Sequence, residues 1–237
     1  MLMLKKENNL VRLITGFYFT IATVEVTAEL FSFKPILFIF EPLMLLLLMI
    51  LYWITSSLKS LLFFGTMFFL LLSKMLFLQN TENMLYFGFI AFLTHQSVII
   101  IYILKLTKLK DYVPSFIAVT PFLFVFFYLF SVSSEIPKNS YYFLVIQNIL
   151  VSVIGAVTLS DYTMKDNKKN SWLLIFGLLT VALYFIDFIE KYYLSDLVLS
   201  IFKLLVMVLN VAVYYAFYKF AIKTESLNLE TENLNNN

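Results

Sequence analysis

Cysteine is absent from this 237-residue sequence, and histidine occurs once, as His95. Without cysteine the chain forms no disulfide, offers no thiol nucleophile and holds no Cys-based zinc or iron–sulfur centre. A single histidine likewise excludes a site that needs several imidazole ligands. We therefore expect neither a metal nor another cofactor.

Charged residues are also scarce. They make up 14% of the chain, whereas hydrophobic residues make up 61%. An average soluble domain has about 25% charged and about 45–50% apolar residues. The composition therefore predicts an integral membrane protein, which we expect in a bacterial inner (plasma) membrane. The formal net charge of +2 is too small to indicate binding to nucleic acid.

Eight apolar segments are long enough to cross a bilayer, which takes about 20 residues of helix. They cover residues 12–31, 36–55, 60–78, 84–104, 113–132, 141–160, 171–191 and 195–220. No cleavage pattern follows the first segment, so we interpret it as a retained span rather than a signal peptide. The sequence predicts an all-α polytopic bundle of eight transmembrane helices in a single domain, residues 1–223. Residues 224–237 are predicted to be a short polar disordered tail.

The distribution of lysine and arginine predicts the orientation of the bundle. If the segments alternate in direction, twelve of the 17 Lys and Arg residues lie on the side that carries both termini. Positive residues concentrate in cytoplasmic loops. We therefore expect both termini to be cytoplasmic.

Ionisable residues inside the spans gather, on this topology, in the outer half of the bilayer. A charged group in hydrocarbon costs roughly 2.5 to 17 kcal/mol by different estimates, so it usually faces protein or a wet cavity. Glu25, Lys74 and Asp187 are each flanked by apolar residues on both sides. We predict a shared polar cavity around them, to which we also assign Glu29, Glu41, Ser73, His95, Tyr102 and Glu190.

Simpler interpretations stay open for several of these residues. Glu29 fits an ordinary interfacial position, and His95 alone is compatible with a helix-packing hydrogen bond. Three long side chains near span ends can reach the headgroups: Glu190, Lys191 and Lys203. Three amides either add to the cavity or join helices: Gln147, Asn148 and Asn210.

Within the site, Glu41 and Lys74 are predicted to form an ion pair. Glu41 opens the second span on the outer side, and Lys74 lies near the outer end of the antiparallel third span. Both therefore sit at similar depth, and pairing lowers the cost of burying either charge. In the fourth span His95 and Tyr102 share a helical face, so we expect Tyr102 on the same wall as the histidine.

Several short motifs carry a family likeness. The run Glu41-Pro42-Leu43-Met44 is similar to the Lys-Pro-Leu-Thr opening of a helix in YhhN-type lysoplasmalogenases, which are eight-span membrane proteins. Further family motifs have counterparts along the chain. These are Gly-Asp at Ser73-Lys74, F-L-x-H at 91–95, Ser-Asp at Ile186-Asp187 and Tyr-Tyr at Tyr214-Tyr215.

Two charges depart from the family pattern. The family's Lys appears as Glu41, and the Asp of its Gly-Asp motif appears as Lys74. This resembles a charge pair whose members have been exchanged. A catalytic carboxylate at position 74 is then lost, and Glu41 supplies a carboxylate from the opposite wall.

The resemblance implies hydrolysis of the vinyl ether bond of a lysoplasmalogen or related lysolipid, with release of a fatty aldehyde. This reaction needs a general acid, an anion that stabilises the oxocarbenium ion, and a positioned water. On this reading the catalytic residues are Asp187 as acid or base, Glu41 as stabilising carboxylate (with Glu25 as the alternative) and His95, which orients water or substrate. Lys74 holds Glu41 or the lipid phosphate.

Two other functions remain open. A lipid-binding or sensory protein that lost the Gly-Asp carboxylate keeps the bundle without the activity. A small proton-coupled transporter uses buried carboxylates, but Pro121 and Gly155 are the only clear helix-breaking residues within spans, and discontinuous binding helices usually show more. For the enzyme and the lipid-binding protein alike, the expected partner is a membrane lipid or lysolipid.

Overall fold

A computed structural model describes residues 2–31, 34–79, 81–107, 112–133, 140–164, 171–193 and 199–235 of the chain. Side chains are described within these ranges except at 2–8, 29, 30, 34–38, 199, 200 and 231–235. Glu29, which we assigned to the cavity, is one of these exceptions. Its side chain therefore lies outside the described residues.

Each predicted span is an α-helix, and no strand occurs within the described ranges. The helices are α1 (Leu2–Leu30), α2 (Lys34–Thr55), α3 (Leu61–Leu78), α4 (Glu82–Thr107), α5 (Val113–Val132), α6 (Tyr141–Met164), α7 (Ser171–Tyr193) and α8 (Leu199–Asn235). Seven of them are long and apolar enough to cross a membrane, and α2 contributes a shorter described apolar stretch, Ile39–Thr55. The all-α polytopic bundle is confirmed, and the chain is an integral membrane protein.

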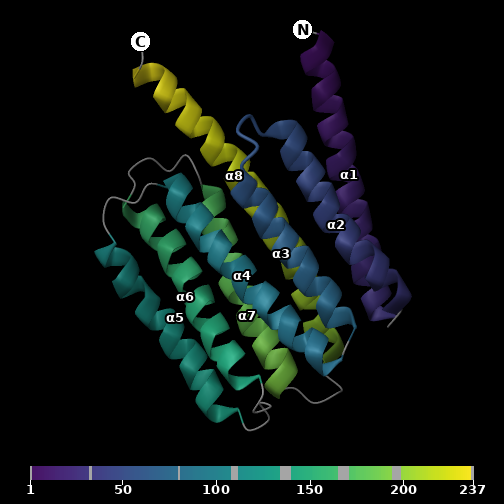
Figure 1. The fold of residues 1–237 in the computed structure, drawn as a ribbon, viewed down its shortest axis with the longest axis vertical. Coiled ribbons are helices and arrows are strands. Elements are labelled where there is room, and N and C mark those ends of the chain that lie inside the picture. The colour runs from purple at the N-terminus through teal and green to yellow at the C-terminus, as the bar shows by residue number, and fades with distance from the viewer. Residues whose placement is uncertain are drawn as a thin grey trace.

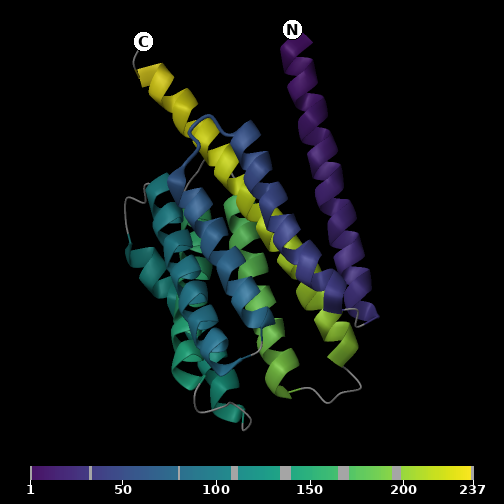
Figure 2. The same ribbon diagram turned by 45° about the vertical axis from the view of Figure 1, so that its right-hand side comes forward.

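The helices run alternately up and down, so both termini lie at one end of the bundle (Figure 1). We call this the terminal end and the opposite one the far end. Helix α8 contacts α1, α2, α4 and α7, and Figure 2 shows it passing beside the α1–α2 pair. Helix α5 packs against α6 at the edge of the bundle. Helix α8 therefore joins the α1–α2 pair to α4 and α7.

Aromatic side chains fill the interior between α2, α3 and α8. The rings of Tyr52 and Phe63 stack with centroids 3.7 Å apart, and Phe63 stacks on Phe217 at 5.4 Å. All three side chains are buried. The outer face of α5 is equally apolar but exposed, with Phe116 and Phe124 more than two-thirds accessible. An exposed apolar face of this kind suits contact with lipid rather than water.

The predicted disordered tail differs from the structure, because α8 continues as a helix to Asn235. Glu225, shortly beyond the predicted span, is buried. Its carboxylate accepts hydrogen bonds from the hydroxyls of Tyr52, Tyr102 and Ser56, the last two at 2.9 and 2.7 Å. One turn further along, Asn228 donates to the carbonyl of Leu106 at 3.3 Å. The polar composition alone predicted disorder, and the partners that hold the segment could not be recognised because they are distant in the sequence.

Helices α6 and α7 approach closely at two glycines. A Cβ on Gly177 would lie 1.9 Å from Thr158 Oγ1, and one on Gly155 would lie 2.7 Å from Val181 Cγ2. Small residues allow such close backbone contact between membrane helices. The α6–α7 contact therefore depends on glycine's lack of a side chain at these two positions. The contact positions α7, the helix that carries Asp187.

Replacing Gly177 with alanine should destabilise the bundle, because the new methyl group collides with Thr158. We expect the free energy of unfolding to fall by about 1–3 kcal/mol, the usual cost of overpacking. Gly65→Ala is the matched control, since no neighbouring atom lies within 4 Å of its added Cβ, and alanine favours helix. Thermal unfolding in detergent measures both variants. Equal stability of the two would contradict the close contact.

Replacing Glu225 with alanine should also destabilise the bundle. Three hydroxyls lose their common acceptor, and a buried unsatisfied polar group costs about 1–3 kcal/mol. Glu230→Ala, an exposed position on the same helix, should leave the unfolding temperature unchanged. The same detergent unfolding assay compares them, and a Glu225→Ala variant as stable as wild type would show that the tail helix does not anchor to α2 and α4.

Candidate functional site

A cavity of about 460 Å³ opens in the far half of the bundle. Its lining comes from α2, α3, α4, α6, α7 and α8. Each of these helices contributes the half that lies away from the termini. This is the beginning of α2, α4, α6 and α8 and the end of α3 and α7. The volume lies in the lower part of the range of about 300–1,000 Å³ that is typical of small-molecule sites.

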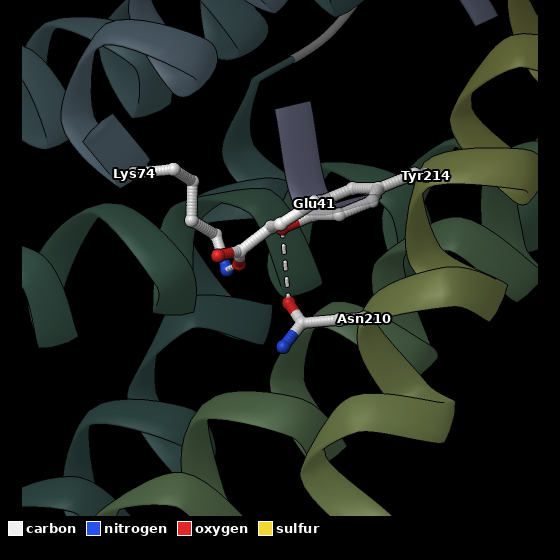
Figure 3. A network of polar contacts seen from close by, with 4 residues as sticks. All are labelled: Glu41, Lys74, Asn210 and Tyr214. Atoms are coloured by element: carbon white, nitrogen blue, oxygen red, sulfur yellow. Dashed lines mark hydrogen bonds and ion pairs between the residues drawn. The ribbon is translucent and has the colours of Figure 1, made fainter. Parts of the chain in front are cut away.

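The Glu41–Lys74 ion pair stands at this cavity, as the sequence predicted. Lys74 Nζ donates to Glu41 Oε1, and Figure 3 shows the two side chains meeting end to end. The glutamate side chain is 15% exposed and the lysine side chain 23%. The pair forms because α2 begins and α3 ends at the same depth of an antiparallel pair. It joins these two helices at the cavity wall.

Helix α8 places an amide and a phenol beside this pair. Tyr214 donates from its hydroxyl to Asn210 Oδ1 at 3.1 Å, across one turn of the helix. Figure 3 shows the tyrosine hydroxyl reaching toward Glu41 from α8. Both residues line the cavity, together with Gln147 of α6. The polar wall thus combines a carboxylate, an ammonium group, a phenol and two amides.

A second ion pair lies on α7. Lys191 Nζ donates to Asp187 Oδ2 at 2.8 Å, one turn along the same helix. The aspartate side chain is 21% exposed and the lysine side chain 55%. Both line the cavity. The cavity therefore offers two negative and two positive groups, and one pair is markedly more accessible than the other.

The remaining lining is apolar and largely aromatic. It includes Phe77 of α3, Phe89 and Phe92 of α4, and Leu183 and Phe188 of α7. A mainly apolar wall with a few convergent polar groups is the usual composition of a site for a small molecule. Here it suits a ligand that has a charged part and a hydrocarbon part.

The structure brings four of the predicted site residues to this cavity, namely Glu41, Ser73, Lys74 and Asp187. The hydroxyl of Ser73 donates to the carbonyl of Gly88 at 3.0 Å, which joins α3 to α4. Ser73 therefore has a packing role as well as a place in the wall.

Four other predicted residues lie away from the lining. His95 is buried and lines a smaller chamber next to the cavity. Tyr102 is two helical turns, roughly 10 Å, further along α4, and this carries it to the Glu225 cluster at the terminal end. Glu25 is buried on α1, which packs on α2 and α8, and Glu190 is buried on α7 without lining the cavity.

Sequence reasoning missed several residues that the structure places at the site, among them Tyr184, Lys191 and Tyr214. Tyr184 lines the cavity, and its position three residues before Asp187 on one helical face was a usable signal. Lys191 was interpreted as a residue that reaches the headgroups, but its partner is Asp187. Spacing of four along a helix favours this opposite-charge pair.

Comparison with protein-family models, with curated proteins and with solved structures gives no match for this chain.

Exchanging the two charges of the Glu41–Lys74 pair tests whether the pair holds α2 to α3. Glu41→Lys or Lys74→Glu alone should lower the free energy of unfolding by about 3 kcal/mol, because each leaves two like charges in a largely buried position. The double variant should recover most of the loss. Lys191→Met is the control and should cost at most about 1 kcal/mol, since that lysine is exposed.

Unfolding in detergent, followed by circular dichroism, measures all four variants. Single variants as stable as wild type, or a double variant no better than the singles, would show that the contact does not contribute to the fold.

Proposed function

We propose that this protein is a lysoplasmalogenase-like membrane hydrolase that binds a single-chain lysolipid in the far-end cavity and cleaves its vinyl ether bond. The observation that supports the proposal is the lining, which combines two ion pairs with aromatic and aliphatic side chains. The likeness of its motifs to YhhN-type proteins suggests the reaction. The cavity suggests the class of ligand.

The charges suit the headgroup of a lysophospholipid. Lys74 and Lys191 are available to a phosphate, which binds lysine as a point charge. Glu41 and Asp187 are available to the ammonium group of an ethanolamine or choline head. A zwitterionic head can therefore exchange partners with both pairs without leaving a charge unpaired, which is the condition for burying it.

The apolar wall suits one hydrocarbon chain. Phe77, Phe89 and Phe92 present rings to the cavity, and burial of apolar surface contributes roughly 25 cal/mol per Å². The cavity volume is in the lower half of the range for small-molecule sites. That volume favours a lipid with one chain over the two-chain lipids that form the bilayer.

Asp187 is the carboxyl group that we assign to proton transfer. Its partner Lys191 is more than half exposed, whereas the partner of Glu41 is mostly buried. An exposed ion pair is weak, with a median of about 0–1 kcal/mol, so Asp187 leaves its pair more readily than Glu41 does. Glu41, held in place by Lys74, is suited to stabilise the positive charge of the oxocarbenium ion.

A non-catalytic lipid-binding or sensory role is the second candidate, and one observation favours it. Both carboxylates that line the cavity are held in ion pairs. An ionised carboxylate accepts hydrogen bonds but donates no proton. A lipid-binding protein keeps the side chains that contact the headgroup but lacks a protonated carboxyl group to act as general acid.

Aldehyde release from a lysoplasmalogen, by protein purified into nanodiscs, tests the proposed reaction. We expect wild type to release the fatty aldehyde and Asp187→Asn to lose at least about 10²-fold in kcat, the usual contribution of a general acid or base. Glu230→Gln, remote from the cavity, is the matched control and should keep full activity. Mass spectrometry measures the aldehyde and, separately, the lipid bound.

The two candidate functions give different results in this assay. Binding of the lysolipid without aldehyde release from wild type is the outcome that the lipid-binding role predicts, and it would refute the hydrolase. Absence of both binding and release would refute both.

A further inference from the structure

A second, much smaller chamber adjoins the cavity in the middle of the bundle. Its volume is about 20 Å³, and its polar lining consists of His95, Gln96, Thr180, Tyr184 and Tyr214. Three residues line both spaces, namely Leu183, Tyr184 and Tyr214. The chamber therefore borders directly on the ligand cavity, and these three side chains belong to the walls of both.

Gln96 has a polar atom without a partner in this chamber. The residue is 1% exposed, and its Nε2 donates to the hydroxyl of Tyr184 at 2.8 Å. Its Oε1 is buried and has no hydrogen-bond partner among the described residues. Reversing the amide would exchange the roles of the two atoms but would still leave one of them unpaired. Such a buried group costs about 1–3 kcal/mol unless something satisfies it.

His95 supplies a second acceptor. Its Nδ1 lies 2.8 Å from the carbonyl oxygen of Thr66 on α3. A carbonyl oxygen only accepts, so Nδ1 must carry a proton. In the neutral ring Nε2 is then an acceptor. His95 and Gln96 are neighbours on α4, and both side chains line the chamber.

The size and chemistry of the chamber fit one water molecule. A water needs at least about 10–15 Å³ of such space and two to four polar partners, and 20 Å³ holds one water without room for a second. Its two hydrogens match two acceptors, Gln96 Oε1 and His95 Nε2. The water oxygen can accept a hydrogen bond from the hydroxyl of Tyr184. That hydroxyl accepts from Gln96 Nε2, so its own hydrogen is available to donate.

We propose that this chamber binds one water molecule between Gln96 and His95, and that this water is the one consumed in hydrolysis. The second part rests on the proposed function. A proton adds to the alkenyl carbon remote from the ether oxygen, and the water oxygen bonds to the carbon next to that oxygen and loses a proton. The resulting hemiacetal breaks its carbon–oxygen bond to give an aldehyde and a glyceryl hydroxyl. One water is consumed, the protons balance, and no oxidant or reductant is required.

An experimental structure of the wild-type protein, at a resolution that shows ordered waters, tests the binding site without any activity. We expect density for a water within hydrogen-bond distance of Gln96 Oε1 and His95. An empty chamber would overturn the proposal, whether or not the protein hydrolyses lysolipids.

The variant Gln96→Met tests the role of the water in the reaction. Methionine has a similar length but provides no carbonyl oxygen, so the water loses one anchor. We expect kcat to fall about 10²-fold, as for a misplaced reactant, with KM and lysolipid binding unchanged. Ser97→Ala is the control, because the hydroxyl of Ser97 bonds only to its own helix, at the carbonyl of Leu93, and should leave both constants unaltered.

The results separate this proposal from the proposed function. A water in the chamber of a wild-type protein that binds lysolipid but releases no aldehyde refutes the hydrolase and the reactive role, and supports the water site. Wild-type activity that Gln96→Met retains in full refutes the reactive role alone. Thermal unfolding confirms that the variant is folded. A raised KM together with a lowered kcat would indicate a packing role for Gln96 and refute the reactive role of the water.

Discussion

A charge inside a bilayer requires a partner, and the Glu41–Lys74 ion pair meets that requirement for two charges at once. Either residue alone would cost several kcal/mol in hydrocarbon. Joined, they connect α2 to α3 and form the polar wall of the far-end cavity. The neighbouring Tyr214 and Asn210 of α8 then face a charged pair rather than lipid (Figure 3). The site depends on this contact, because it keeps a polar surface open in the far half of an apolar bundle.

The bundle has polar groups near both ends, and the two sets differ in kind. At the terminal end, the carboxylate of Glu225 is buried and takes three hydroxyl donors from α2, α4 and the turn after α2. All three donors are uncharged hydroxyls. The far-end groups line open space and carry both signs of charge. The first set anchors α8, and the second is available to a ligand.

Composition predicted most of the fold, because a bilayer imposes span lengths that can be read directly from hydropathy. The Glu41–Lys74 pair was predictable for the same reason: antiparallel spans fix relative depth. Depth alone does not fix direction around a helix, so Glu190 was assigned to the cavity and lies elsewhere. Tyr102 shares a helical face with His95 but lies two turns nearer the terminal end, beside Glu225. Glu225 was missed because its partners are more than a hundred residues away, and a polar tail alone resembles disorder.

The central claim is that charged and polar side chains in the spans surround one hydrated cavity. Since the chain has no cysteine, single cysteines can report on water at chosen positions, because only the hydrated thiolate reacts. We predict that Asn210→Cys and Gln147→Cys in membranes react with a charged thiol reagent, and that a lysolipid protects them. The outward-facing controls Phe68→Cys and Phe124→Cys should stay unlabelled. Equal and negligible labelling at all four positions would contradict the account.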